Sequence, residues 1–124
     1  MNFTVGFQIN THGYVCGEAE ERAVLVRTRR ALDAFYQADP DGNKHFYQAH
    51  LANYGDAFFE SKALLLVTRR ESSGSIALRV EGVELTDGQP KARITRSAPG
   101  FGTMDMARWV IGIELERDII QKKG

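Results

Sequence analysis

The sequence is poor in the features that cross-link a chain, charge it with one sign or anchor it in a membrane. It has one cysteine, Cys16, so no internal disulfide can form, and a reducing cytoplasm is the simplest compartment to expect. Its 16 basic and 16 acidic residues cancel, which disfavours a general nucleic-acid binder. No apolar run approaches the length of about 18 residues that a membrane-spanning helix needs.

The first residues also lack the features of a signal peptide. Residues 1–9 have neither a basic start nor a continuous apolar stretch. We therefore expect no signal peptide, and a cytoplasmic protein. A mature fragment whose leader had been removed would look the same, so secretion stays open.

The composition that is present fits a globular domain. Of 124 residues, 43% are hydrophobic and 26% charged, which is enough apolar material for a core without disulfides. We expect one α+β domain over residues 1–124, with residues 117–124 as a polar tail. There is no repeat, linker or low-complexity segment.

Apolar periodicity predicts the first half of the chain. Residues 3–9 alternate apolar and polar side chains, which is typical of a strand with one buried face. Residues 22–28 are rich in β-branched residues and predict a second strand, although the flanking charged stretches also fit a longer helix. Thr28 is a candidate helix N-cap before Leu32 and Phe35. Apolar residues in the segment 47–58 recur at helical spacing.

The second half of the chain is predicted to be β-structure. The continuous apolar run 63–67 indicates a strand buried on both faces. Residues 76–85 alternate, and the phase slips at Gly82, which predicts a β-bulge. Asp87-Gly88 is a strong hairpin signal. The fold class expected is α+β, with a single antiparallel curled sheet of about five to seven strands packed on one or two helices.

Residues 58–116 carry a resemblance to a known family. They contain a Phe-Phe pair, an apolar strand, the turn Ser72-Ser73-Gly74-Ser75-Ile76, two strands split by Asp-Gly, and the segment 99–109 before a closing strand. This order resembles the PrcB C-terminal domain family and related small bacterial proteins of unknown function. The family's named member is an accessory lipoprotein that associates with and stabilises a surface protease. The resemblance therefore implies a protein-binding module without catalysis, with a protease as one possible partner.

The leading hypothesis is a non-enzymatic protein-binding module that uses two glycine-containing loops, residues 72–75 and 99–108. Bulky apolar residues among glycines are typical of a recognition tip. Apolar anchoring is assigned to Phe101 and Met104, and a polar rim to Asp105 and Arg108. The turn residues Ser73, Gly74 and Ser75 complete the predicted contact surface. Zero net charge also favours self-association, so a homodimer is a further expectation.

The alternative hypothesis is a protein that binds or sequesters a small anionic, nucleotide-like ligand. Arginine side chains suit phosphates and carboxylates, and the candidate ligands are Arg27, Arg30, Arg69 and Arg70. Arg27 and Arg30 lie at the predicted junction of a strand and a helix, where anions are favoured. The sequence does not say whether the two pairs of arginines meet in space.

Catalysis, metals and cofactors find no support in the sequence. Ser73 and Ser75 lack the base and glycine spacing of a seryl hydrolase, so a hydrolase is the third and weakest reading, with no catalytic residue assigned. His45 and His50 are five residues apart, which separates them on a helix and on a strand, so no metal site is expected. Gly100-Phe101-Gly102 lacks the third glycine of a dinucleotide fingerprint, and no cofactor is expected.

Overall fold

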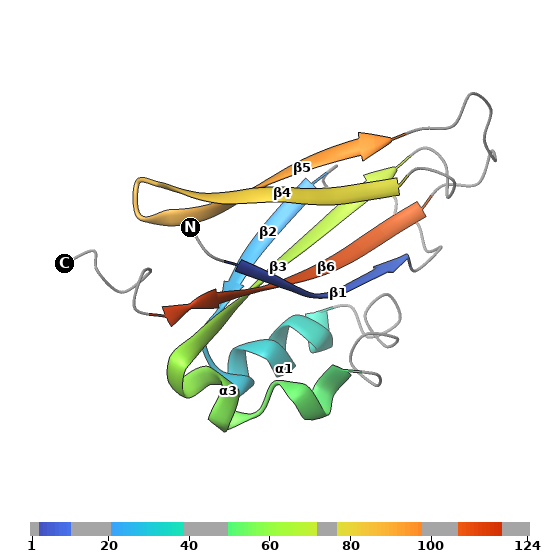
Figure 1. The fold of residues 1–124 in the computed structure, drawn as a ribbon. Coiled ribbons are helices and arrows are strands. Elements are labelled where there is room, and N and C mark those ends of the chain that lie inside the picture. Colours follow the sequence, from blue (N-terminus) through green and yellow to red (C-terminus); the bar gives the residue numbers. More distant parts are fainter. Residues whose placement is uncertain (1–2, 11–20, 39–49, 72–76, 98–106, 118–124) are drawn as a thin grey trace.

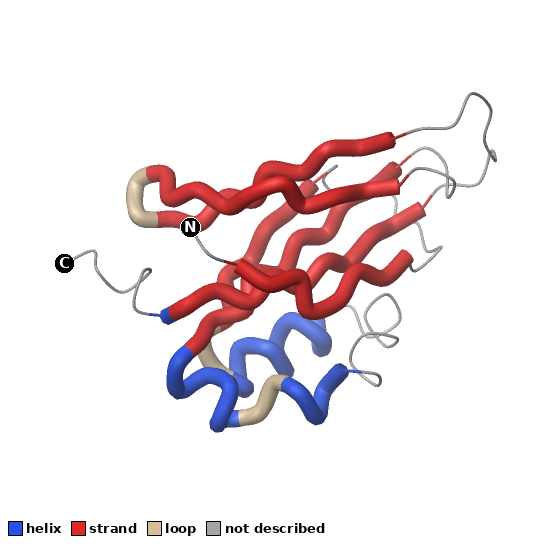
Figure 2. Tube along the Cα trace, in the orientation of Figure 1, coloured by secondary structure: helices blue, strands red, loops and turns tan. Residues whose placement is uncertain are grey.

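The computed structural model describes residues 3–10, 21–38, 50–71, 77–97 and 107–117, and their arrangement is α+β, as predicted (Figure 1). The elements in chain order are β1 (Phe3–Asn10), β2 (Glu21–Val26), α1 (Arg29–Ala38), the 3₁₀ turn η1 (Leu51–Asn53), α3 (Asp56–Ser61), β3 (Lys62–Glu71), β4 (Ala77–Thr86), β5 (Gln89–Ser97) and β6 (Ala107–Glu116). Figure 2 shows three layers, which are a two-stranded hairpin, a larger sheet and the helices beneath it.

The larger sheet is antiparallel throughout, in the order β1-β6-β3-β2. Its inner strand β3 carries the apolar run 63–67, and each residue of that run is at most 1% exposed. Alternate residues of the run belong to two cores, one under the hairpin (Ala63, Leu65, Val67) and one against the helices (Leu64, Leu66). Because successive strand side chains point to opposite faces, such a run needs cover on both sides. The predicted burial on both faces is confirmed.

The strands β4 and β5 form a separate hairpin with a two-residue turn. The turn residues Asp87 and Gly88 have φ values of 54° and 79°, the positive values that an Asp-Gly hairpin turn requires. The register shifts between Val80 and Gly82, so the predicted bulge is also confirmed. The inner apolar residues of the hairpin pack onto the β3–β6 face of the larger sheet.

The prediction of a single sheet is wrong, because the six strands that the structure describes divide into two sheets. The hairpin lies over one face of the larger sheet and does not extend its edge (Figure 1). Gln8 of β1 donates a side-chain hydrogen bond to the Leu78 carbonyl oxygen of β4 at 2.8 Å, but the two strands form no ladder. A strand with alternating apolar residues buries one face in either case, whether it stacks on the face of another sheet or pairs with the edge of that sheet. A period of two therefore cannot distinguish the two arrangements.

A second bulge divides β1 between the two cores. The register of β1 against β6 shifts between Val5 and Phe7, with Gly6 as the extra residue. Phe3, before the bulge, packs toward the hairpin, whereas Phe7 and Ile9, after it, pack toward the helices. The alternation of residues 3–9 predicted one buried face for the whole strand. That expectation is corrected, because the inserted residue reverses the face that the second half presents.

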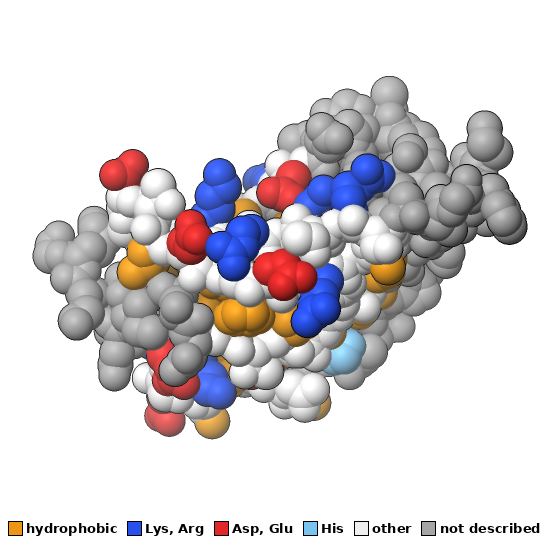
Figure 3. All heavy atoms as spheres, turned by 45° about the horizontal axis from the view of Figure 1, so that its top comes forward, with side chains coloured by type: hydrophobic (Ala, Val, Ile, Leu, Met, Phe, Trp, Pro, Cys, Tyr) orange, Lys and Arg blue, Asp and Glu red, His pale blue; other side chains and the backbone are white. Residues whose placement is uncertain are grey.

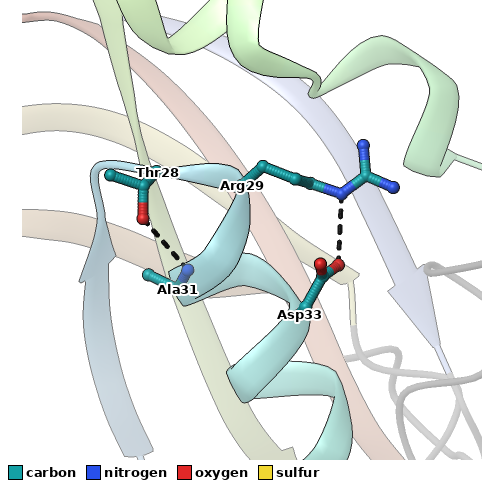
Figure 4. A network of polar contacts seen from close by, with 4 residues as sticks. All are labelled: Thr28, Arg29, Ala31 and Asp33. Carbon is teal, nitrogen blue, oxygen red and sulfur yellow. Dashed lines mark hydrogen bonds and ion pairs between the residues drawn. The ribbon is translucent and has the colours of Figure 1, made fainter.

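The helix α1 begins as the sequence predicts. Thr28 Oγ1 accepts a hydrogen bond from the Ala31 amide at 3.0 Å (Figure 4). The Thr28 carbonyl accepts one from the Leu32 amide at 3.1 Å. Arg29 Nε lies 3.1 Å from Asp33 Oδ1 one turn later (Figure 4). Leu32 is fully buried against the sheet. A capped start and one apolar face thus set the direction of the helix.

Gly112 of β6 leaves space for an aromatic ring on the helix side of the sheet. A Cβ atom built at Gly112 would lie within 2.8 Å of three atoms of the Phe7 ring. That ring stacks on His50 with centroids 4.8 Å apart and meets Tyr54 edge-on at 5.9 Å. The missing side chain at Gly112 therefore lets this aromatic cluster rest directly on the sheet.

We expect Gly112→Ala to lower the free energy of unfolding by about 1–3 kcal/mol, because the new methyl group overlaps a closely packed ring. Urea unfolding followed by fluorescence measures the change. Gly55→Ala is the matched control, since no heavy atom lies within 4 Å of a Cβ built there. Gly55 is the N-cap of α3, and we expect Gly55→Ala to lower the free energy of unfolding by no more than about 1 kcal/mol. Equal losses in the two variants would contradict the close approach of Phe7.

Candidate functional site

Most residues of the two predicted recognition loops lie outside the described residues. This applies to Ser73, Gly74 and Ser75 of the first loop and to Phe101, Met104 and Asp105 of the second. Their assignment to partner contact stays a prediction.

Arg108 does not fit the exposed rim that the sequence predicted. It is the second residue of β6 and is 3% exposed, with its backbone opposite Arg70 of β3. The prediction placed Arg108 in a loop because the preceding segment is rich in glycine, but the last strand begins earlier, at Ala107. A buried guanidinium cannot belong to a solvent-exposed rim, so Arg108 is removed from the predicted contact surface.

The arginines of the predicted anion site do not all come together. Arg27 and Arg30 flank the junction of β2 and α1, whereas Arg69 pairs with Glu21 at the opposite end of β2. Five residues of strand separate the two ends, which is about 17 Å at about 3.4 Å per residue. For Arg70 only the backbone position, next to Arg69 in β3, is described. Arg69 lines the hollow described next, whereas Arg27 and Arg30 do not.

A hollow of about 380 Å³ lies between the hairpin and the β2 end of the larger sheet, and we call it the hairpin hollow. It is lined by Glu21, Arg69, Glu84, Thr86, Lys91, Ala92, Arg93 and Ile94. The first two residues come from the larger sheet and the others from the hairpin, so the stacking of the two sheets creates the space. Sequence analysis missed Lys91 and Arg93, because only the stacking brings them near Arg69.

Opposite charges are paired around the hairpin hollow, with one cation left over. Arg69 Nη1 lies 3.3 Å from Glu21 Oε1, and Arg93 Nη1 lies 3.0 Å from Glu84 Oε1. Lys91 forms no ion pair with any residue that the structure describes. The side chains of Arg93 and Glu84 are 61% and 67% exposed, so their pair adds little stability and can rearrange at small cost. Figure 3 shows acidic and basic side chains interspersed over the hairpin.

Strand edges are the second candidate surface. Within the described residues, β1, β2, β4 and β5 each have an edge without a ladder partner. Charged residues occur in β2, β4 and β5, and β5 also contains Pro90, whereas the eight residues of β1 include neither. Charges and proline are what natural proteins place on edges to prevent pairing with another chain. Apart from the bulge at Gly6, β1 lacks this protection, and its Val5 is 39% exposed.

A small hollow of about 70 Å³ lies at the end of the larger sheet where β1 and β3 begin and β6 ends, and we call it the corner hollow. It is lined by Phe3, Thr4, Lys62, Glu114 and Glu116. Two carboxylates and one ammonium give the lining a negative balance. Lys62 Nζ lies 3.9 Å from Glu114 Oε1, which is the outer limit of an ion pair.

Glu114 also connects the corner hollow to the helix-side core. Tyr54 is 2% exposed, and its hydroxyl donates a hydrogen bond to Glu114 Oε2 at 2.9 Å. Burial raises the pKa of the Tyr54 hydroxyl far above its usual range, and the neighbouring Glu114 carboxylate adds to this shift. Gly6 makes room for the contact, because a Cβ there would lie within 2.6 Å of both oxygens. The sequence predicted Tyr54 only as an apolar helix position, because its hydrogen-bond partner Glu114 is 60 residues away along the chain.

Neither a metal-binding cluster nor a membrane-spanning helix is found in the described part of the chain. In residues 3–10, 21–38, 50–71, 77–97 and 107–117, no group of three or more His, Cys, Asp or Glu side chains could hold a metal ion. No helix among these residues is long and apolar enough to cross a membrane.

Comparison with known proteins does not assign the chain to a family. A scan against protein-family models finds no match, and searches of curated proteins and of solved structures find none either. The resemblance to the PrcB C-terminal domain family stays a prediction.

We expect Tyr54→Phe to lower the free energy of unfolding by about 1–2 kcal/mol at neutral pH, because the Glu114 carboxylate loses a buried donor. The change should also alter the pH dependence. Folding raises the pKa of the Tyr54 hydroxyl, so the protonated hydroxyl contributes its full stabilisation below about pH 10. As the pH rises further this contribution is lost, because only the unfolded chain then releases the proton.

Urea unfolding between pH 7 and pH 11 measures both effects. The unmodified chain should lose stability above about pH 10 more steeply than the Tyr54→Phe variant. The same slope in the two proteins would contradict the burial of the hydroxyl against Glu114.

Proposed function

We propose that the chain is a non-enzymatic protein-binding module that takes an extended segment of a partner protein along the edge of β1. The observation that carries the proposal is the contrast between β1 and the other open edges of the described structure. Those edges carry charges or proline, and β1 carries neither. An edge without such residues is a template for a further strand.

The surroundings of β1 supply both affinity and selectivity. In strand addition, main-chain hydrogen bonds give affinity, and pockets for alternate side chains give selectivity. Val5 offers exposed apolar contact on the strand itself. The corner hollow lies beside the first residues of β1, and its negative balance favours a short polar or basic side chain of the partner segment.

The bulge in β1 favours a partner segment over a second copy of this chain. In a symmetric antiparallel pair of β1 strands, the two bulges would lie near the dyad, because Gly6 is close to the middle of Phe3–Asn10. Two irregular backbones would then face each other where the ladder should be most regular. In addition, β1 has no basic residue to place in the corner hollow. A flexible foreign segment is free of both restrictions.

The family resemblance supports the same class of function. An accessory protein that stabilises a protease acts by binding and not by catalysis, and a protease is accordingly one class of partner to consider. The predicted loop 99–108 runs into β6, the neighbour of β1 in the sheet. Phe101 and Met104 of that loop stay the predicted apolar anchors for the same partner.

The test is a binding measurement with nine-residue peptides selected from a random display library on the intact chain. Val5→Lys places a charge on the β1 edge and should weaken binding about tenfold or more. Ala23→Lys places the same charge on the exposed, opposite edge strand β2 and should leave the affinity unchanged. Isothermal titration gives the affinities, and thermal melting checks that both variants fold.

Two results would overturn the proposal. If Val5→Lys binds as tightly as the unmodified chain, whereas the double variant Phe101→Ala, Met104→Ala does not bind, recognition belongs to the loop and not to the β1 edge. If the unmodified chain sediments as a dimer and Val5→Lys as a monomer, the edge is occupied by a second copy and not by a partner.

A further inference from the structure

We infer that the hairpin hollow is a second binding site, separate from the β1 edge, and that it takes a small organic phosphate. It opens at the junction of the two sheets, and its lining draws on β2, β3, β4 and β5. Its volume of about 380 Å³ lies at the small end of the range for ligand pockets. That size suits a phosphate monoester of about the size of a mononucleotide or smaller.

Three cations approach the hollow from two layers of the fold. Lys91 and Arg93 are two residues apart on β5, so their side chains leave the strand on the same side. Arg69 comes from β3 in the larger sheet. Donors from several directions suit a tetrahedral phosphoryl group, which offers three terminal oxygens, better than a planar carboxylate, which one arginine fork can satisfy.

Gly82, which follows the bulge in β4, leaves room for the Arg93 side chain. Gly82 lies directly opposite Arg93 in the hairpin register. A Cβ at Gly82 would lie 3.0 Å from Arg93 Nη2, so the glycine lets the guanidinium cross β4 toward Glu84. Arg93 Nη1 donates a hydrogen bond to Glu84 Oε1 at 3.0 Å. Because both side chains are largely exposed, this contact is weak, and an arriving anion can take over the guanidinium at small cost.

The two carboxylates also limit which anions can bind. Glu21 and Glu84 balance two of the three cations, so the lining keeps one excess positive charge. A single phosphoryl group can engage the unpaired Lys91 and share Arg93 with Glu84. A polyanion such as nucleic acid would place further phosphates beside the carboxylates, where like charges repel. Ala92 and Ile94 leave β5 on the side opposite to Lys91 and Arg93 and pack toward the core, so they line only the inner part of the hollow.

The test is isothermal titration of the intact chain with adenosine 5′-monophosphate, phenyl phosphate and glycerol 3-phosphate, with adenosine as the probe that lacks phosphate. We expect at least one phosphate monoester to bind with a Kd below about 1 mM and adenosine not to bind. Double substitution Lys91→Gln, Arg93→Gln should weaken that binding about tenfold or more.

Arg79→Gln is the matched control. Arg79 is an arginine of the same hairpin that pairs with Glu81 at 3.4 Å and does not line the hollow. Its variant should bind like the unmodified chain. The proposal is overturned if no phosphate monoester binds, if the double variant binds unchanged, or if Arg79→Gln loses as much affinity as the double variant.

Discussion

The rest of the structure depends on one strand that must be covered on both faces. The run 63–67 in β3 is apolar at every position, and no arrangement with a single packed layer can bury it. The hairpin covers the side of Ala63, Leu65 and Val67, and the helices cover the side of Leu64 and Leu66. The three layers follow from this requirement. The hairpin hollow follows from the same requirement, because the hairpin covers the face of the larger sheet near β2 without forming a ladder with that strand.

Local signals in the sequence predicted the elements well, but not how they combine. The Thr28 cap, the Asp87-Gly88 turn and the bulge near Gly82 each depend on neighbouring residues, and all three are confirmed. The division into two sheets and the change of face at Gly6 depend on long-range packing, which a period of two does not encode. The candidate site shows the same limit. Arg69 was identified from its type alone, whereas Lys91 and Arg93 join it only through the stacking of the sheets.

The distribution of charge gives the two proposed surfaces different characters. Charged residues on β2, β4 and β5 keep those edges from adding strands, and on the β5 side Lys91 and Arg93 also line the hairpin hollow. The strand β1 lacks such residues and offers its main chain and Val5 instead. One surface therefore suits a compact anion and the other an extended polypeptide. The two surfaces lie at the two edge strands of the larger sheet, the hairpin hollow at β2 and the strand-binding edge at β1. One molecule therefore has room for both occupants.

In the proposed function, the outer edge of β1 is open in the free chain and is closed by a partner strand. Amide hydrogen exchange, resolved residue by residue in the intact chain, distinguishes the two states. We expect the amides of β3 and β6 to exchange only on global unfolding, while the amides of β1 that point away from β6 exchange rapidly and become protected when a binding peptide is present. Outward amides of β1 that are already protected in the free chain would contradict strand addition at this edge, because another part of the same chain would then cover it.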